Sequence, residues 1–394
     1  MKAVAAGADM VDREEPFLIG PAHVDVDLTN ACNLSCSHCD VSSGLPLAGE
    51  MSTAEFRTLI DNLFELGVLS VTIAGGEPFL RRDVVELLSY ACAHAGWNIT
   101  VITNGMFLTP EMVLALRRDC PGLRINISLD GSTPDIFDLT RHGRRRGAPA
   151  RHSLFTRVCG AVRRAADEGL DVHVNSTLTS ANHGDLGALH DLVHELGARS
   201  LLAIKFFAGG RGLAHMAAME FDYATWAAVM VDLTRRKLSG ELPGLALSVP
   251  AAWEFYLPLL DAGIEVPDAE EVWGYQAPLR QAPYGSSGHI GDPSGIADLN
   301  IVGNGDVYPI TLMSGTPSAR CGTIIEQPLG EIWRSSATLW RLRDLRVGDL
   351  PVGCQTCEIG QVCGGGSRAR ALIHTGDFAG PDIACPRLDP ACTR

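Results

Sequence analysis

An alternation of short apolar runs with amphipathic stretches, from residue 21 to about 240, most limits the fold that this chain can adopt. Six apolar runs have the composition of strands, and each is followed by a segment with helical periodicity. The predicted strands cover 23–29, 70–76, 98–105, 123–131, 171–179 and 200–210. Strands that alternate with helices form a parallel sheet with right-handed crossovers. Six units predict an α/β fold with a partial (β/α)6 TIM-like barrel, because a complete barrel needs eight.

The sequence changes character after residue 240. Pro, Gly and Ser interrupt residues 241–293, where no period persists, and we expect a bridging segment that touches substrate. Residues 296–310 are typical of a β-hairpin that turns at Gly303, and a helix and a cysteine-rich tail follow. We therefore expect an N-terminal tail over 1–20, the partial barrel over 21–240, the bridging segment over 241–293 and a cysteine-rich domain over 294–394.

Composition and charge exclude several classes of partner. Hydrophobic residues make up 46% of the chain, enough for a sizeable core, and the formal net charge is −14. An acidic chain is a poor partner for a nucleic-acid backbone or an anionic membrane. No apolar run is long enough to span a bilayer, and the N-terminus lacks the apolar core of a signal peptide. We expect a cytoplasmic protein, with the basic run at 141–151 forming a solvated loop or, alternatively, holding an acidic substrate group.

Twelve cysteines are many for a cytoplasmic chain, where thiols stay reduced and clusters of them indicate metal binding or catalysis. Three of the twelve lie singly in helical segments and are expected to be small buried apolar residues: Cys92, Cys120 and Cys159. The other nine fall in a loop after the first predicted strand and in the C-terminal region. We therefore expect two separate cysteine sites.

The first site is the loop "CNLSCSHC", which carries Cys32, Cys36 and Cys39. It follows a strand of the predicted barrel and so lies at the carboxyl-terminal mouth, where catalytic loops collect. A structural zinc site needs four ligands, and the only further candidate nearby is His38, between two of the cysteines. Three thiolates with one vacancy fit a [4Fe–4S] cluster whose fourth iron remains open to another ligand.

With this spacing the loop resembles the radical S-adenosylmethionine (SAM) superfamily. The resemblance implies that the open iron binds the amino and carboxylate groups of SAM. One electron, from a donor such as flavodoxin or ferredoxin, then breaks the sulfonium bond. The resulting 5′-deoxyadenosyl radical takes a hydrogen atom from the substrate, while the protein binds, orients and excludes water.

Segments at three further predicted strand ends match the same family: "GGEP", "TNG" and "SLDG". By resemblance, the first contacts the methionine amino group, with Glu77 as acceptor, and Ser128 and Arg141 hold the SAM carboxylate. His38 stands where the family commonly has an aromatic residue beside the adenine. The resemblance thus implies cofactor-binding roles for His38, Gly75, Gly76, Glu77, Pro78, Asn104, Ser128 and Arg141.

The second site is in the tail, where Cys354, Cys357, Cys363 and Cys385 supply a closed set of four ligands. Their spacing alone favours zinc, for which paired cysteines are usual ligands. The segments "GNGDVYPI", "LGEIW" and "CGGGS" instead resemble a SPASM domain, which carries auxiliary iron–sulfur clusters. The resemblance therefore implies an auxiliary [4Fe–4S] cluster on these four thiols.

Two departures from the SPASM pattern reduce the expected number of clusters. Ile310 and Ser367 stand where that pattern has cysteines of the first auxiliary cluster, and neither is a suitable iron ligand. We therefore expect one auxiliary cluster, with a cluster that uses Cys321 or Cys392 as the weaker alternative. Otherwise these two cysteines are inert thiols, or Cys321 is a hydrogen-atom donor, as in some radical SAM epimerases.

Enzymes with this combination of domains act mostly on ribosomally made peptides, and "FFAGGRG" at 206–212 resembles that branch. The leading hypothesis is a peptide-modifying enzyme that installs a crosslink. Because only about twenty residues precede the barrel, we expect either a separate leader-peptide-binding partner or none. The alternatives are an epimerase or dehydrogenase of an aminocyclitol or sugar in antibiotic biosynthesis, and a non-catalytic metal-binding protein.

Overall fold

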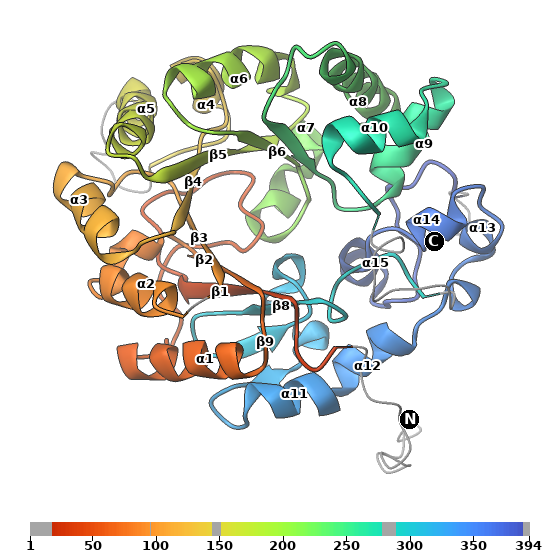
Figure 1. Ribbon diagram of the computed structural model, residues 1–394. Coiled ribbons are helices and arrows are strands. Elements are labelled where there is room, and N and C mark those ends of the chain that lie inside the picture. Colours follow the sequence, from red (N-terminus) through yellow and green to blue (C-terminus); the bar gives the residue numbers. More distant parts are fainter. Residues whose placement is uncertain (1–17, 95, 144–150, 278–288, 389–394) are drawn as a thin grey trace.

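A ten-stranded sheet that curves into a partial barrel forms the centre of the computed structural model (Figure 1). The structure describes residues 18–94, 96–143, 151–277 and 289–388. The strands are β1 (His23–Thr29), β2 (Ser70–Gly75), β3 (Asn98–Thr103), β4 (Arg124–Ser128), β5 (Asp171–Leu178), β6 (Leu201–Lys205), β7 (Leu245–Ser248), β8 (Asp298–Ile301), β9 (Asp306–Tyr308) and β10 (Gly322–Thr323).

The order of the strands confirms the predicted fold class and extends the predicted sheet. The order is β10-β9-β8-β1-β2-β3-β4-β5-β6-β7, and every pair from β8 to β7 is parallel. The six predicted strands, β1 to β6, are therefore present, with β7 added beside β6 and β8 beside β1. The predicted hairpin is formed by β8 and β9, but β8 also joins the barrel by pairing with β1.

Strand β7 lies inside the segment predicted to have no regular element, residues 241–293. Its sequence, "LALS", is four residues long and too short to show a period, so only its pairing with β6 identifies it. Because one sheet draws strands from three of the predicted segments, the boundaries at 240 and 293 mark changes of composition, and as domain limits they stay predictions.

Helices cover the outer face of the barrel, and the C-terminal helices α13, α14 and α15 lie on its side between α9 and α12 (Figure 1). The single helix predicted to follow the hairpin is divided at Ser336, which adopts an extended conformation. The helices are α1 (Thr53–Glu65), α2 (Val84–Cys92), α3 (Pro110–Asp119), α4 (Pro134–Phe137), α5 (Arg151–Asp167), α6 (Leu186–Glu195), α7 (Met216–Met219), α8 (Tyr223–Leu238), α9 (Trp253–Asp261), α10 (Val266–Trp273), α11 (Leu329–Ser335), α12 (Ala337–Asp344), α13 (Val352–Gln355), α14 (Gly360–Cys363) and α15 (Arg368–Thr375).

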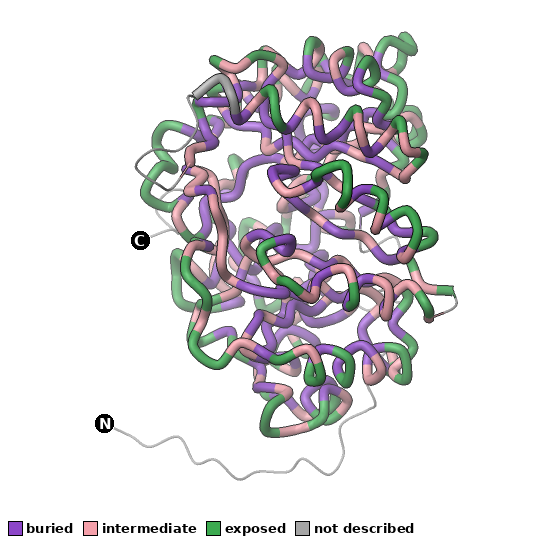
Figure 2. The backbone as a smooth tube through the Cα atoms, turned by 90° about the vertical axis from the view of Figure 1, so that its left-hand side faces the viewer, coloured by how far each residue is buried: buried purple, intermediate pink, exposed green. Residues whose placement is uncertain are grey.

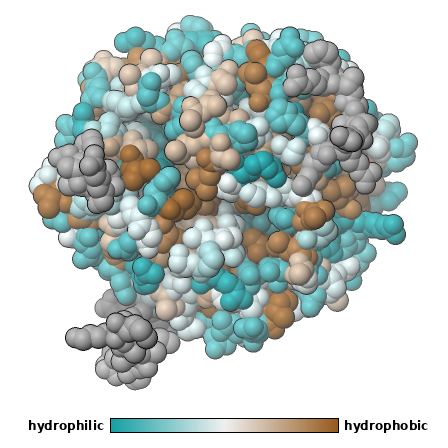
Figure 3. Space-filling view, turned by 180° about the vertical axis from the view of Figure 1, so that it is seen from behind, coloured by the Kyte–Doolittle hydropathy of each residue, from teal (hydrophilic) through white to brown (hydrophobic). Residues whose placement is uncertain are grey.

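The main core lies between the sheet and these helices. Figure 2 shows buried residues along the inner strands and exposed residues on the outer helical turns. Helix α1 illustrates the pattern: Ser52 and Glu55 form a capping box at its start, and Phe56 and Leu63 are among the residues that it buries. No helix in the described part of the chain combines the length and the apolar character needed to cross a bilayer. Seen from behind, hydrophilic and hydrophobic residues are interspersed over the surface (Figure 3).

Candidate active site

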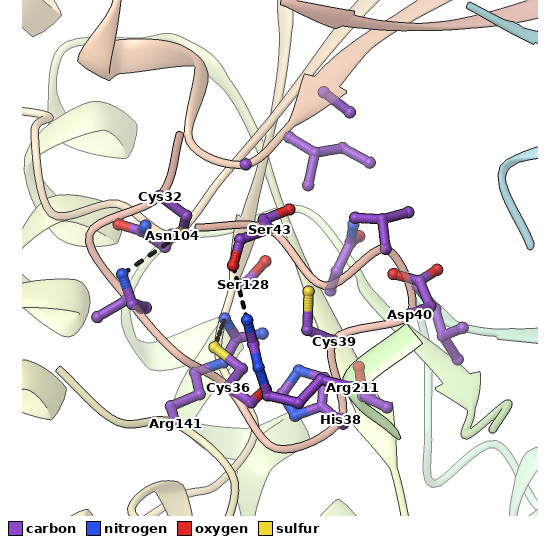
Figure 4. A pocket seen from close by; sticks show the side chains of 18 of the residues that line it. Cys32, Cys36, His38, Cys39, Asp40, Ser43, Asn104, Ser128, Arg141 and Arg211 are labelled. Carbon is purple, nitrogen blue, oxygen red and sulfur yellow. Dashed lines mark hydrogen bonds between the residues drawn. The ribbon is translucent and has the colours of Figure 1, made fainter. Parts of the chain in front are cut away.

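A cavity of about 260 Å³ lies where the parallel strands end, and the three cysteines of the first loop line it (Figure 4). We call it the mouth cavity. Each of β2 to β4 contributes the residues at or just after its carboxyl end, and β6 contributes Lys205. The predicted site residues that line the mouth cavity are Cys32, Cys36, His38, Cys39, Gly75, Gly76, Asn104, Ser128 and Arg141. The fold therefore brings together residues that the sequence places in five separate segments.

The three thiols suit an iron–sulfur cluster. A [4Fe–4S] cluster binds each thiolate through a different iron, so the three thiols of this loop could hold three of its four irons. The Leu34 backbone N–H donates to Cys32 Sγ at 3.4 Å, and Arg141 Nη1 donates to Cys36 Sγ at 3.9 Å. Burial raises the pKa of Cys36 to about 11, so binding to iron would replace the proton of this thiol.

Gly75 and Gly76 allow β2 to approach the start of the cysteine loop. A Cβ on Gly76 would lie 2.1 Å from the Ala31 carbonyl oxygen, and one on Gly75 would lie 2.4 Å from that of Thr29. The Gly76 N–H donates to the Thr29 oxygen at 2.7 Å, and Gly75 has a φ of +114°, which favours glycine. These glycines therefore position the loop that carries the thiols, in addition to lining the mouth cavity.

Glu77 and Pro78 do not line the mouth cavity. The fully buried Glu77 carboxylate accepts hydrogen bonds from Thr103 Oγ1 at 2.7 Å, the Asn104 N–H at 2.8 Å and the Phe79 N–H at 3.1 Å. Burial raises the pKa of Glu77 to about 7, although these hydrogen bonds oppose the shift. The structure therefore gives Glu77 a positioning role, joining the ends of β2 and β3, and Pro78 begins the turn that follows.

Asn104 connects the end of β3 to the cysteine loop. Its Nδ2 donates to Asn33 Oδ1 at 2.8 Å, and its Oδ1 accepts the Met106 N–H at 3.0 Å. Asn33 lies next to Cys32 in the sequence, so this contact restrains the loop at its first thiol.

Asp130 organises the other side of the mouth cavity and was not predicted. Its Oδ2 accepts from Arg141 Nε at 2.6 Å and lies 3.5 Å from His38 Nε2, and its Oδ1 accepts the Thr177 N–H at 2.9 Å. Burial opposes ionisation, but the Arg141 guanidinium and His38 outweigh it and hold the pKa of Asp130 below its usual range. Asp130 therefore fixes Arg141 beside Cys36. Its position two residues after the end of β4, in "SLDG", was the available signal.

His38 and Arg211 complete the mouth cavity (Figure 4). The His38 side chain is 9% exposed, and burial lowers its pKa to about 4. Its Nδ1 is buried with no hydrogen-bond partner among the described residues, as expected for an atom that meets a ligand. Arg211, also not predicted, donates to the Cys36 oxygen at 2.9 Å and the Ser43 oxygen at 2.7 Å, which clamps the loop.

The four predicted tail cysteines, Cys354, Cys357, Cys363 and Cys385, line a second, small cavity. Gly364, Gly365 and Gly366 follow α14 with positive φ angles, and a Cβ on Gly366 would lie 2.5 Å from Asp382 Oδ2. The four thiols therefore share one cavity, and each could bind a separate iron of a cluster.

Four positions of the C-terminal region either had alternative roles or departed from the SPASM pattern: Cys321, Cys392, Ile310 and Ser367. Cys321 lines neither cysteine cavity: it is buried in the main core beside β9, so the structure does not place it as a hydrogen-atom donor or ligand. Cys392 lies outside the described residues. Ser367 instead caps α15, where its hydroxyl accepts the Arg370 N–H at 3.3 Å.

Comparisons with known proteins agree with this geometry. The model of the Radical SAM superfamily matches residues 26–192. PqqA peptide cyclase of Ruegeria pomeroyi is 30% identical over 382 residues, which cover 95% of this chain and 90% of that protein. AdoMet-dependent heme synthase of Methanosarcina barkeri is 28% identical over 371 residues, covering 93% and 96%.

Among solved structures, Streptococcus suis SuiB bound to precursor peptide SuiA has a TM-score of 0.71 at 18% identity. The match covers 95% of this chain and 76% of SuiB, and it shows a common fold. The family match, the PqqA peptide cyclase and the three thiols at the barrel mouth lead to one identification. The chain belongs to the radical SAM superfamily, whose enzymes use a [4Fe–4S] cluster and SAM.

Proposed function

We propose that this radical SAM enzyme modifies a ribosomally synthesised peptide, most simply by forming a crosslink. The observation that carries the proposal is the similarity of nearly the whole chain, C-terminal region included, to a peptide cyclase. The fold shared with SuiB, which was solved with its precursor peptide, supports a substrate of the same class.

The residues of the mouth cavity would bind the cluster and SAM in distinct ways. Cys32, Cys36 and Cys39 would hold the cluster, which when bound supplies the electron that cleaves SAM. Ser128 and the terminal amines of Arg141 would bind the SAM carboxylate, because Asp130 already occupies Arg141 Nε and fixes the plane of the guanidinium. The largely buried His38 ring would pack beside the adenine and offer its unpartnered Nδ1. These contacts would hold the reacting end of SAM inside the barrel, away from water.

The tail cysteines are proposed to hold one auxiliary [4Fe–4S] cluster, and a flavodoxin or ferredoxin is the proposed electron donor. This arrangement gives about eight irons per chain, four in each cluster. A separate protein that binds the leader segment of the peptide is the further proposed partner.

The test uses the anaerobically reconstituted full chain with SAM, a strong reductant and candidate precursor peptides encoded beside its gene. We expect 5′-deoxyadenosine and a peptide product lighter by two hydrogens, detected by mass spectrometry. Cys32→Ala should abolish both products, whereas Cys159→Ala, on α5 and outside both cysteine sites, should leave them unchanged. SAM cleavage with no change in any peptide, but with conversion of a sugar or aminocyclitol, would refute the peptide proposal.

A further inference from the structure

A larger cavity of about 620 Å³ extends from the mouth cavity into the barrel. Asn175 and Lys205 line both cavities, so the two adjoin. We call the larger one the interior cavity; the residues that matter here are Asp25, Asn126, Asn175, Asp292, Ser294 and Asp298. Ile310 and Ser367, which replace expected cysteines, also line it, so no sulfur ligand occupies this wall.

The interior cavity has more acidic than basic groups available to a ligand. Asp25, Asp292 and Asp298 line it. Burial raises the pKa of Asp298 to about 7; the nearby His23 opposes this shift, and Asp25 and Asp292 add to it. The basic side chains in its lining are His23 and Lys205. Both are already engaged: His23 Nε2 lies 3.1 Å from Asp25 Oδ1 and His23 Nδ1 lies 2.8 Å from Ser70 Oγ.

The positive charge of Lys205 Nζ is neutralised by two glutamates rather than by the aspartates that line the cavity. It lies 2.9 Å from Glu254 Oε1 and 3.1 Å from Glu220 Oε1, and its side chain is buried. Asp292 in turn accepts the N–H groups of Ser294 and Arg368 at 2.9 and 2.7 Å. The Asp298 carboxylate makes no hydrogen bond with any side chain that the structure describes, so it is the acceptor most available to a ligand.

Buried polar atoms without partners point to a ligand in the same cavity. Ser294 is 1% exposed and Asn175 is 6% exposed, and neither Ser294 Oγ nor Asn175 Oδ1 has a partner among the described residues. Asn126 Oδ1 is a third such atom. Leaving polar atoms buried and unpaired costs free energy, and in native proteins such atoms normally meet water or a ligand. These oxygens and the nearby carboxylates all accept hydrogen bonds.

We propose that the interior cavity recognises a cationic, hydrogen-bond-donating group of the substrate, a guanidinium or primary ammonium, with Asp298 as its main partner. An ammonium or guanidinium supplies only donors and a positive charge, which the lining of the cavity lacks in available form. The inference rests on the proposed function in taking the occupant to be the substrate, for instance an Arg or Lys side chain of the peptide.

The test measures binding of n-butylguanidinium to the reconstituted full chain with SAM, by isothermal titration calorimetry at constant ionic strength. 1-Butanol and butyrate serve as neutral and anionic comparators of similar length. We expect saturable binding of one n-butylguanidinium per chain and none of the comparators. Asp298→Asn should weaken binding about tenfold, and Ser294→Ala less, as expected for loss of a hydrogen bond to a charged group.

Asp268→Asn is the matched control, because Asp268 is exposed on α10 and does not line the cavity, so this variant should bind the probe as the native chain does. Asp298→Asn removes the carboxylate and keeps the side-chain volume, and a thermal unfolding curve checks that it folds. The inference would be overturned if Asp298→Asn and Asp268→Asn weakened binding equally, if butyrate bound as well as the cation, or if the cation did not bind.

The outcomes separate this inference from the proposed function, because the binding assay needs no turnover. A protein that modifies a peptide but binds no cation refutes the recognition site alone. A protein that binds the cation through Asp298 but modifies no peptide confirms the site and refutes the proposed function.

Discussion

The two cysteine sites are built in different ways, although both bring thiols to one cavity. At the mouth cavity, one loop carries the thiols, and residues from the ends of β2 to β6 surround it. At the tail cavity, short helices and consecutive glycines with positive φ bring the four thiols together, and Trp253 of α9 is the barrel's contribution. The mouth therefore depends on the sheet for its geometry, whereas the tail depends mainly on local turns.

The largest expected effect separates the sites by chemistry. Cys36→Ala should abolish 5′-deoxyadenosine formation and reduce iron from about eight to about four atoms per chain, because three thiolates are the minimum for the proposed cluster. Iron analysis and chromatography of the reaction measure both. Cys92→Ala, on α2 and outside both cavities, is the control. Retention of SAM cleavage by Cys36→Ala would show that the mouth thiols are not the ligands.

The second effect is the converse at the tail. Cys354→Ala should also lower iron to about four atoms per chain, yet leave slow SAM cleavage without substrate near the native rate, since the mouth cavity is intact. Product formation on the peptide should be lost. If Cys354→Ala instead stopped SAM cleavage, the two sites would not be separable as their construction predicts.

The third effect concerns Asp130, which follows β4 and holds Arg141 beside the mouth cavity. Asp130→Asn should leave the buried Arg141 guanidinium without its counter-charge, which costs about 3 kcal/mol of unfolding free energy and weakens SAM binding. Denaturant unfolding and equilibrium dialysis with SAM measure the two losses. Asp119→Asn is the control: it breaks an exposed ion pair with Arg118 and should change stability little, because exposed ion pairs are screened by solvent.

The fourth effect is a pH dependence of opposite sign in the two regions. Near the mouth, burial raises the pKa of Asp27 to about 8, so the folded chain keeps a proton that the unfolded chain has lost. The contribution of Asp27 to the unfolding free energy is therefore lost as pH rises from about 4 towards 8. Asp27→Asn should remove that decline.

At the tail, burial opposes ionisation of Asp382, but the Arg370 guanidinium, 3.0 Å away, and hydrogen bonds hold its pKa below the usual range. Its contribution is present above the unfolded pKa and is lost as pH falls below about 4. Asp382→Asn should therefore destabilise the chain most at neutral pH. Denaturant titrations between pH 3 and 8 for both variants measure the slopes, and slopes of the same sign would contradict this contrast.

The smallest effect concerns Ser367, which stands where a ligand was expected. Ser367→Ala should lower the unfolding free energy by about 1 kcal/mol through loss of the cap of α15, with no change in iron content. Ser367→Thr keeps a capping hydroxyl and should retain most of the stability. A loss of iron in Ser367→Ala would mean that this oxygen binds a cluster after all.

Local pattern predicted much of the site. The three loop cysteines, Gly75 and Gly76, and Asn104 and Ser128 line the mouth cavity, and the four predicted tail cysteines line the second cavity. Glu77 lies outside the mouth cavity, and its carboxylate accepts hydrogen bonds from Thr103 and Asn104. Asp130 and Arg211 were not predicted, because their partners lie in other segments. Side-chain partners across a barrel leave no periodic trace in the sequence, so these roles required the structure.

The sequence by itself determined the alternation of strands and helices, the two groups of cysteines and hence the family, because all depend on spacing within short segments. The tertiary structure alone decided that β7 and β8 extend the barrel, since such short strands are stabilised by pairing rather than by their own composition. It also decided that Asp25, near the N-terminus, and Asp298, near the start of the C-terminal region, line one cavity. Paired strands β1 and β8 set that proximity, which no local pattern contains.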